Sequence, residues 1–445
     1  MSDKKKISHI SPERMERYTW HKGDLKFFKN AEELQRHADE HGEKIIWYDA
    51  DKSKSAAYRN LVERAKKRYP ACQDASKNPV ALGAPVVNGV NVCNEINLYT
   101  YWQGFGYAEH TPKIKYLLVA QDWGNFIATG NELKDAVAKM NAGEKIFYPY
   151  SLQSVTDKNL IELFKILDRD ITEPCADVFF TNFCLGYRLG KSSGDMTKEL
   201  MMRDADLFRE LCEILAPENI LCLGRITSEC VCAALAGDAF KRIFSEAKSY
   251  NTFLDSAPQI VLPCSADKKT LSRVYPLAHC GFYGTQNRPL DIQRQDWQRI
   301  IDEKKIDMAI ENFRLTNSPA DKAKILDEIF ARVQTNDSFI VALNEEPMEI
   351  DAAIPIFKNM KAVFLRNKHD GKFFLATFTD LFEFARFNEA AGKIYTFMYV
   401  SAAKLLHDCS ADDDTAEGII LNPVSENQFI LTRDDVKNLL KAKNF

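Results

Sequence analysis

Short apolar runs alternate with stretches of helical periodicity through the first two thirds of the chain. Apolar runs that predict β-strands occupy residues 115–121, 176–182, 219–223, 259–264 and 273–279. Apolar positions three and four residues apart predict helices over 31–41, 58–68, 198–215, 226–235 and 293–304. Strands separated by helices normally build a parallel sheet with helices on both faces. We therefore expect a layered αβα domain with a mainly parallel central sheet.

The pattern restarts after the turn residues at 312–320. Beyond them, we expect helices over 320–333, 380–391, 401–408 and 433–442. Strands are expected over 338–344, 361–366, 372–378, 393–400, 418–422 and 428–432. The sequence thus predicts two domains, residues 1–315 and 316–445, the second a smaller α/β domain.

Composition is consistent with this division, because 445 residues exceed what one ordinary core holds and 45% of them are hydrophobic. The 11 cysteines lack the spacing of a disulfide framework, which favours a reducing compartment and a cytoplasmic protein. The polar start, Met1 to Lys6, lacks the apolar segment of a signal peptide. No apolar run approaches a membrane-spanning length, so we expect no membrane partner.

Charge limits where a nucleic acid could bind. With 59 Lys and Arg against 63 Asp and Glu, the net charge of −4 does not suggest nonspecific nucleic-acid binding. Residues 1–70 carry 17 basic and 12 acidic groups, whereas residues 316–445 carry 15 and 20. A DNA-binding surface must therefore be local. The candidate cations are Lys66, Lys67, Arg68, Arg188, Lys191, Arg225, Arg273 and, above all, Arg288; solvated surface roles are the alternative.

Polar residues follow three of the predicted strands. Asp122 follows Gln121 at the end of the first, where open α/β sheets bind ligands; a solvated turn aspartate is the alternative. Asn182 ends the second strand, and its amide has the donor and acceptors needed to recognise a pyrimidine edge. His279 ends another strand in a glycine-containing loop and is a candidate electrophile. Taken singly, Asn182 and His279 could equally be structural.

In this order, and together with residues 220–235, these segments resemble the uracil-DNA glycosylase superfamily over residues 90–305. The resemblance implies that Asp122 orients water and stabilises the sugar, with Gln121 beside it at the substrate. It also implies that Asn182 recognises uracil and that His279 stabilises the departing base. The aromatic platform for the base would be Phe126 or Phe147. Phe282 or Tyr283 would fill the vacated stack, and Arg288 would contact a phosphate.

The expected function is therefore excision of uracil, or a related deaminated base, from DNA. Trp123 and Cys280 stand where the family usually has proline and often serine, which keeps two alternatives open. One is a nucleic-acid or nucleotide sensor that retains the pocket without efficient hydrolysis. The other is an enzyme with a reactive Cys280, although adjacent strand residues point to opposite faces and no separate base is evident. The spacing of Cys72, Cys93 and Cys184 does not support an iron–sulfur cluster, so no cofactor or metal is expected.

The last 126 residues, 320–445, resemble the N-terminal domain of the SseB family. Residues 373–381, 418–423 and 428–432 carry the resemblance. It implies an accessory interaction module with a protein partner of unknown identity. His369 and His407 are too isolated in sequence to suggest a metal site.

Overall fold

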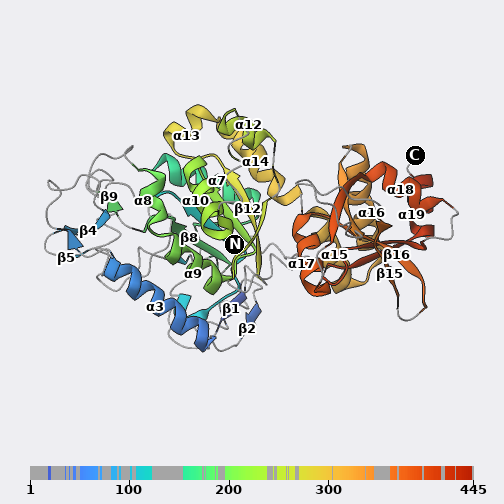
Figure 1. Cartoon of the computed structure of the whole chain (residues 1–445), viewed down its shortest axis with the longest axis horizontal. Helices are drawn as coiled ribbons and strands as arrows, with labels where there is room; N and C mark the ends of the chain where they lie inside the picture. Colours follow the sequence, from blue (N-terminus) through green and yellow to red (C-terminus); the bar gives the residue numbers. More distant parts are fainter. Residues whose placement is uncertain are drawn as a thin grey trace, which may run out of the picture. The chain divides into compact units, whose positions relative to one another are not determined.

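The chain forms two compact units, Met1–Gln298 and Arg299–Phe445 (Figure 1). In the computed structural model, the described residues are 19–21, 36, 40, 44–46, 51–68, 71–72, 82–87, 90–91, 101–102, 107–122, 154–172, 175, 177–185, 187–188, 196–237, 244, 248–256, 258, 260–265, 270–302, 304–335, 337–344, 361–367, 370–392, 395–411, 416–425 and 427–442. No helix in these ranges is long and apolar enough to cross a membrane.

A six-stranded sheet with the order β11-β12-β10-β7-β8-β6 forms the centre of the first unit. Its strands are β6 (Tyr101–Trp102), β7 (Tyr116–Ala120), β8 (Val178–Asn182), β10 (Asn219–Leu223), β11 (Ile260–Pro263) and β12 (Leu271–Leu277). The four inner strands are parallel, whereas β6 and β11 pair antiparallel at the two edges. The predicted α/β class with a mainly parallel sheet is therefore confirmed for this unit.

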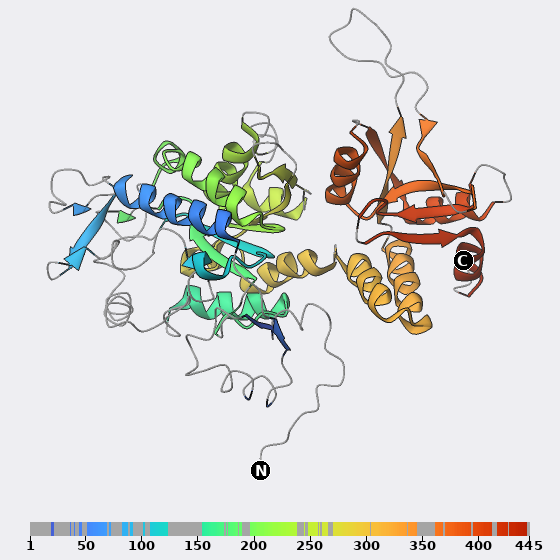
Figure 2. The same ribbon diagram turned by 90° about the horizontal axis from the view of Figure 1, so that it is seen from below.

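Helices lie on both faces of this sheet, and Figure 2 shows α3 and α14 on opposite sides of it. The helices of the first unit are α3 (Lys52–Arg68), α5 (Tyr107–His110), α7 (Val155–Ile166), α8 (Lys198–Met202), α9 (Ala205–Leu215), α10 (Arg225–Ala236), α12 (Tyr250–Asp255), α13 (Phe282–Asn287) and α14 (Leu290–Asp302), which crosses the division between the units. Leu117 and Val119 of β7 share one core with Leu211 of α9 and Val231 of α10. Elsewhere, Phe164 of α7 packs edge-on against Trp297 of α14, with ring centroids 5.2 Å apart.

Two small sheets complete the described part of the first unit. β1 (Thr19–His21) pairs with β2 (Lys44–Ile46), and β4 (Leu82–Val87) pairs with β3 (Ala71–Cys72), β5 (Val90–Asn91) and β9 (Tyr187–Arg188). Of the helix expected over 31–41, only residues 36 and 40 belong to the described ranges, and both are helical.

The second unit contains a seven-stranded sheet in which only β16 and β18 pair parallel among the described strands. The strands are β13 (Ser338–Asn344), β14 (Lys361–Ala362), β15 (Phe364–Arg366), β16 (Phe373–Phe378), β17 (Thr396–Ser401), β18 (Gly418–Leu421) and β19 (Phe429–Thr432). The helices are α15 (Lys305–Thr316), α16 (Pro319–Gln334), α17 (Leu381–Ala391), α18 (Ala402–Ser410) and α19 (Arg433–Ala442). The expected mixed α/β pattern is confirmed here as well.

The structure corrects three boundaries. The predicted helix over 198–215 is two helices, because the chain turns at Arg203 and Asp204. The predicted strand over 361–366 is interrupted at Val363, whose N–H bonds instead to the carbonyl of Ala342.

The third correction concerns the link between the units, because residues 315 and 316 end helix α15 inside the second unit. Ile306 and Ile310 of α15 are buried in the core of that unit. Asp307 Oδ1 accepts hydrogen bonds from Thr379 Oγ1 at 3.0 Å and from Asn422 Nδ2 at 2.8 Å. Helix α15 therefore belongs to the second unit by both apolar and polar contacts.

Candidate active site

Asp122, Asn182 and His279 lie at one edge of the central sheet. In the parallel register, Ala120 of β7 pairs with Asn182 of β8, and Asp122 follows Ala120 by two residues. His279 follows the last residue of β12, also by two residues. Because the carboxyl ends of parallel strands meet at the same edge, the three residues share that edge. Only β10 separates β7 from β12, which places these strands about 10 Å apart.

Backbone hydrogen bonds fix the turn that carries Asp122. The N–H of Phe183 donates to Ala120 O at 2.8 Å, and the N–H of Cys184 donates to Gln121 O at 3.0 Å. Parallel pairing of β7 and β8 therefore continues past the end of both strands. The Asp122 side chain is half-buried, and Gln121 Nε2 lies 3.5 Å from its Oδ1, which is a weak contact.

Asn182 is buried, with 2% of its surface exposed, and its side-chain amide makes no hydrogen bond to the described part of the chain. A structural asparagine at such a site normally has partners. Asn219, for example, is equally buried, and its Nδ2 donates to the carbonyl of Lys115 at 2.9 Å. No other described residue uses the hydrogen-bonding capacity of the Asn182 amide, which makes it a candidate ligand contact.

The His279 ring is held as a neutral donor. The N–H of Gly281 donates to Nδ1 at 2.9 Å, so Nδ1 acts as an acceptor and the neutral ring carries its proton on Nε2. Desolvation by the surrounding protein lowers the pKa of His279. The residue is nevertheless exposed to solvent, which limits the size of this effect. Both observations favour the neutral ring at pH 7, with Nε2–H free to donate.

Helix α7 anchors the loop that follows His279. Asn159 Nδ2 donates to Cys280 O at 2.7 Å, and Cys280 Sγ lies 3.7 Å from Thr156 O. Gln293 of α14 reaches the His279 carbonyl from another side, at 3.4 Å. The sequence patterns had indicated none of these contacts. A serine at position 154, which caps α7, followed by apolar residues at 160, 163 and 164, was the available signal.

Two glycines lie beside His279. A Cβ on Gly284 would lie 1.7 Å from the His279 carbonyl oxygen. A Cβ on Gly281 would lie 2.8 Å from Thr156 Oγ1 and 2.9 Å from His279 Cε1. At Gly284 the close atoms are backbone, so the chain packs around the histidine there only because a side chain is absent, whereas at Gly281 the side chains of Thr156 and His279 would have to shift.

Phe282 and Tyr283 directly follow this loop in α13 and are the most exposed large apolar residues of the described first unit. Their exposed fractions are 58% and 67%, and their ring centroids lie 5.4 Å apart, edge to face. The structure therefore presents two aromatic rings to solvent, three and four residues after His279. Phe126, Phe147 and Trp123, the other aromatic residues considered from the sequence, lie outside the described ranges.

Arg288 is not available to contact phosphate, contrary to the sequence-based expectation. It is buried, and its Nε and Nη2 donate to both oxygens of buried Asp296 at 2.5 and 2.7 Å. Its Nη1 donates to Asp255 at 3.0 Å. These hydrogen bonds, chiefly to Asp296, raise the pKa of Arg288. Arg288 therefore links Asp255 at the end of α12 to Asp296 of α14.

Other cations considered for DNA binding are also paired within the protein. Arg68 pairs with Asp204 and Asp206, Arg225 with Glu229, and buried Arg273 with Glu218 at 3.5 Å. Lys191 and the side chains of Lys66 and Arg188 are outside the described part of the chain.

Cys280 has the properties of a packed residue and not of a nucleophile. It is fully buried, and burial raises the pKa of its thiol to about 12. Seven further described cysteines are also buried, and no group of three or more potential metal ligands is found among the described residues.

Comparison with known proteins adds no relative. No protein-family model matches the chain, and no curated protein is significantly similar to it. Both resemblances drawn from the motifs therefore stay predictions, as does the protein partner expected for the second unit.

Proposed function

We propose that the first unit hydrolyses the N-glycosidic bond of uracil, or of a related deaminated base, in DNA. One observation carries the proposal: parallel strands β7, β8 and β12 bring an acid, a buried amide and an imidazole to the same edge of the sheet. Excision of a pyrimidine needs these three groups, as the charges in its transition state show.

Breaking the bond leaves positive charge on the sugar and negative charge on the departing base. The Asp122 carboxylate stabilises the oxocarbenium-like sugar and orients the water that attacks it. Nε2–H of His279 donates to the uracil O2, where negative charge develops. A neutral imidazole is a suitable donor here, because it stabilises the anion without requiring a proton to be taken up first.

Recognition of the base falls to Asn182. Its Nδ2 donates to the uracil O4 and its Oδ1 accepts from N3–H. Cytosine offers an amino group and a bare ring nitrogen at the same two positions, so both hydrogen bonds would be lost. Loss of paired hydrogen bonds at a buried site is a strong basis for discrimination.

The base must leave the helical stack to reach these groups, since the target bond is inaccessible within a duplex. The exposed rings of Phe282 and Tyr283 supply apolar surface that fills the space left by the flipped base. Their position directly after the histidine loop couples this insertion to the placement of His279.

Asp122→Asn tests the mechanism. Uracil-containing oligonucleotides are incubated with the protein, and abasic sites are then cleaved with alkali. We expect the variant to bind DNA as the parent does but to excise uracil at least about a hundredfold more slowly, because one preorganised electrostatic contact contributes on the order of 3 kcal/mol. Asp291→Asn, which changes an exposed aspartate in the first turn of α14, is the matched control and should leave the rate unchanged.

The outcomes separate the candidate functions. A parent protein that binds uracil-containing DNA without releasing base would favour the sensor over the enzyme. An Asp122→Asn variant as active as the parent on every uracil substrate would refute the mechanism.

A further inference from the structure

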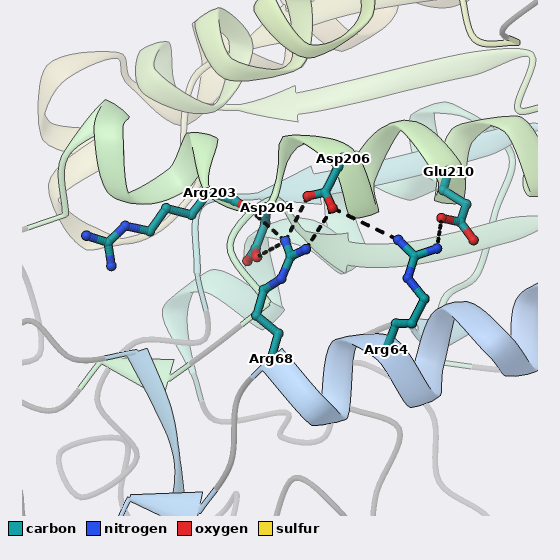
Figure 3. Close-up of polar contacts among 6 residues, drawn as sticks. All are labelled: Arg64, Arg68, Arg203, Asp204, Asp206 and Glu210. Atoms are coloured by element: carbon teal, nitrogen blue, oxygen red, sulfur yellow. Dashed lines mark hydrogen bonds and ion pairs between the residues drawn. The ribbon is translucent and has the colours of Figure 1, made fainter.

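Five charged side chains connect helix α3 to helix α9 (Figure 3). Arg64 and Arg68 project from α3, one helical turn apart, towards Asp204, Asp206 and Glu210. Arg64 pairs with Glu210, and both side chains are partly exposed. Such surface pairs contribute little to stability. Arg68, in contrast, pairs with the buried carboxylate of Asp204.

Arg68 binds Asp206 and Asp204 together. Its Nη1 and Nη2 donate to the two oxygens of Asp206 at 2.8 and 2.7 Å, and Nη1 also lies 3.2 Å from Asp204 Oδ1. The hydrogen bond from Arg68 lowers the pKa of Asp206 to about 2 and raises that of Arg68. The arginine is therefore charged and fixed in orientation at any physiological pH.

Asp204 is fully buried and bonds away from its own helix. It occupies the N-cap position of α9, where an aspartate usually accepts from a helix N–H, but its side chain makes no such bond. Its Oδ2 instead accepts from the N–H of Leu185 at 2.8 Å. The carboxylate thus joins Arg68 on one side to the segment that follows β8 on the other.

That segment continues directly from β8, which ends at Asn182, and is hydrogen-bonded to the turn that carries Asp122. Leu185 follows Asn182 by three residues, and the intervening N–H groups of Phe183 and Cys184 bond to the carbonyls of Ala120 and Gln121. Residues 183–185 are therefore held on one side by the turn that carries Asp122 and on the other by Asp204. Displacing Leu185 would move both Asn182 and the Asp122 turn.

We propose that Asp204 and Arg68 are positioning residues for the candidate site, setting the placement of Asn182 and thereby the choice of base. This inference rests on the proposed function only for its effect on base choice. A buried charge is an unfavourable way merely to attach a helix, because apolar residues of similar volume usually serve as well or better. The Leu185 N–H, however, needs an acceptor inside the protein, and Asp204 provides it.

Four variants test this role. Asp204→Ala removes the acceptor, whereas Asp204→Asn keeps an oxygen for Leu185. Arg64→Gln is the matched control, because it weakens the same α3–α9 contact without touching Arg68 or the Leu185 bond. The readouts are kcat and KM for uracil-containing DNA, the ratio of uracil to cytosine excision, and amide hydrogen exchange of residues 183–185.

For Asp204→Ala, we expect kcat and the uracil-to-cytosine ratio each to fall at least about tenfold, with KM little changed, since a buried donor is left unsatisfied. Exchange at Leu185 should accelerate. Asp204→Asn should restore most of the ratio, and the Arg64→Gln control should match the parent in kcat and in exchange. Arg68→Gln keeps the Asp204 acceptor for Leu185 but removes the cation that pairs with the Asp204 carboxylate, and it should lower the uracil-to-cytosine ratio severalfold. If Asp204→Ala does not fold, this variant tests the positioning role in its place.

A folded Asp204→Ala variant with parental kcat, ratio and exchange would overturn the inference while leaving the proposed function intact. Equal losses in Arg64→Gln and Asp204→Ala would also overturn it, by showing only a packing role. If the parent releases no base, the proposed function fails. In that case, unchanged exchange at residues 183–185 in Asp204→Ala would overturn the positioning role, and faster exchange confined to that variant would support it.

Discussion

Gly284 provides the most direct test of how the histidine loop is built, through the change Gly284→Ala. The new methyl carbon would lie 1.7 Å from the carbonyl oxygen of His279 and 2.6 Å from its carbonyl carbon. Real Cβ atoms almost never approach within 3.0 Å of another heavy atom, so the two backbone segments must separate by about 1.3 Å. Neither neighbour is a flexible side-chain tip, and the displacement must therefore fall on His279 or on α13.

The sign of the stability change is the informative quantity. Glycine to alanine within a helix ordinarily stabilises by about 1 kcal/mol. Here we expect overpacking to reverse the sign, with a loss of about 1 to 3 kcal/mol in the free energy of unfolding. Moving a reacting group by about 1 Å typically costs on the order of a hundredfold in rate, so uracil excision should fall by that factor.

Urea denaturation gives the stability, and single-turnover excision gives the rate. Gly237→Ala is the control, because a Cβ there meets no atom of the described residues within 4 Å, although its φ of +65° costs about 1 kcal/mol in backbone strain. It should lose stability and keep the parental rate. A Gly284→Ala protein that is more stable than the parent and equally active would refute the account of the loop.

Two further outcomes follow from buried groups near His279. Arg288→Ala should lower the free energy of unfolding by about 3 to 5 kcal/mol, because the buried Asp296 carboxylate loses its arginine partner, while DNA affinity stays unchanged; a stable variant with weakened DNA binding would return Arg288 to the phosphate-binding role. The pKa of Cys280 is raised to about 12, so at pH 8 its thiol stays protonated. Iodoacetamide labelling followed by mass spectrometry should accordingly modify the partly exposed Cys409 well before Cys280, and the reverse order would revive a reactive-cysteine mechanism.

Strands β7, β8 and β10 were predictable because each is a compact apolar run that stops at a polar residue or a glycine. β7, β8 and β10 match their expected positions to within two residues, and β8 ends at Asn182 as expected. Placing Asp122 and Asn182 at one edge needed only the rule that parallel strands end on the same side. The local pattern and the fold agree at these positions, so the sequence sufficed.

Long-range pairing was not predictable in the same way. Arg288 stands next to the histidine loop in sequence, but Asp255 and Asp296, which neutralise it, are separated from it by 33 and 8 residues. The requirement for Gly284 arises from the backbone of His279, five residues away, folding over the start of α13. Arg68 shows the same limit: a cation in a basic run of sequence is, in the fold, paired with the buried carboxylate of Asp204 and the exposed carboxylate of Asp206.

The location of α15 has a practical consequence for dissecting the chain. A fragment that begins at residue 316, where turn residues suggest a boundary, would lack Ile306, Ile310 and Asp307. The first two leave an apolar surface uncovered on the second unit, and such surfaces promote aggregation. Without Asp307, the buried amide of Asn422 loses the acceptor of its Nδ2 hydrogen bond. The independently folding part therefore begins where its core begins, ahead of α15, and not at the most conspicuous break in the sequence.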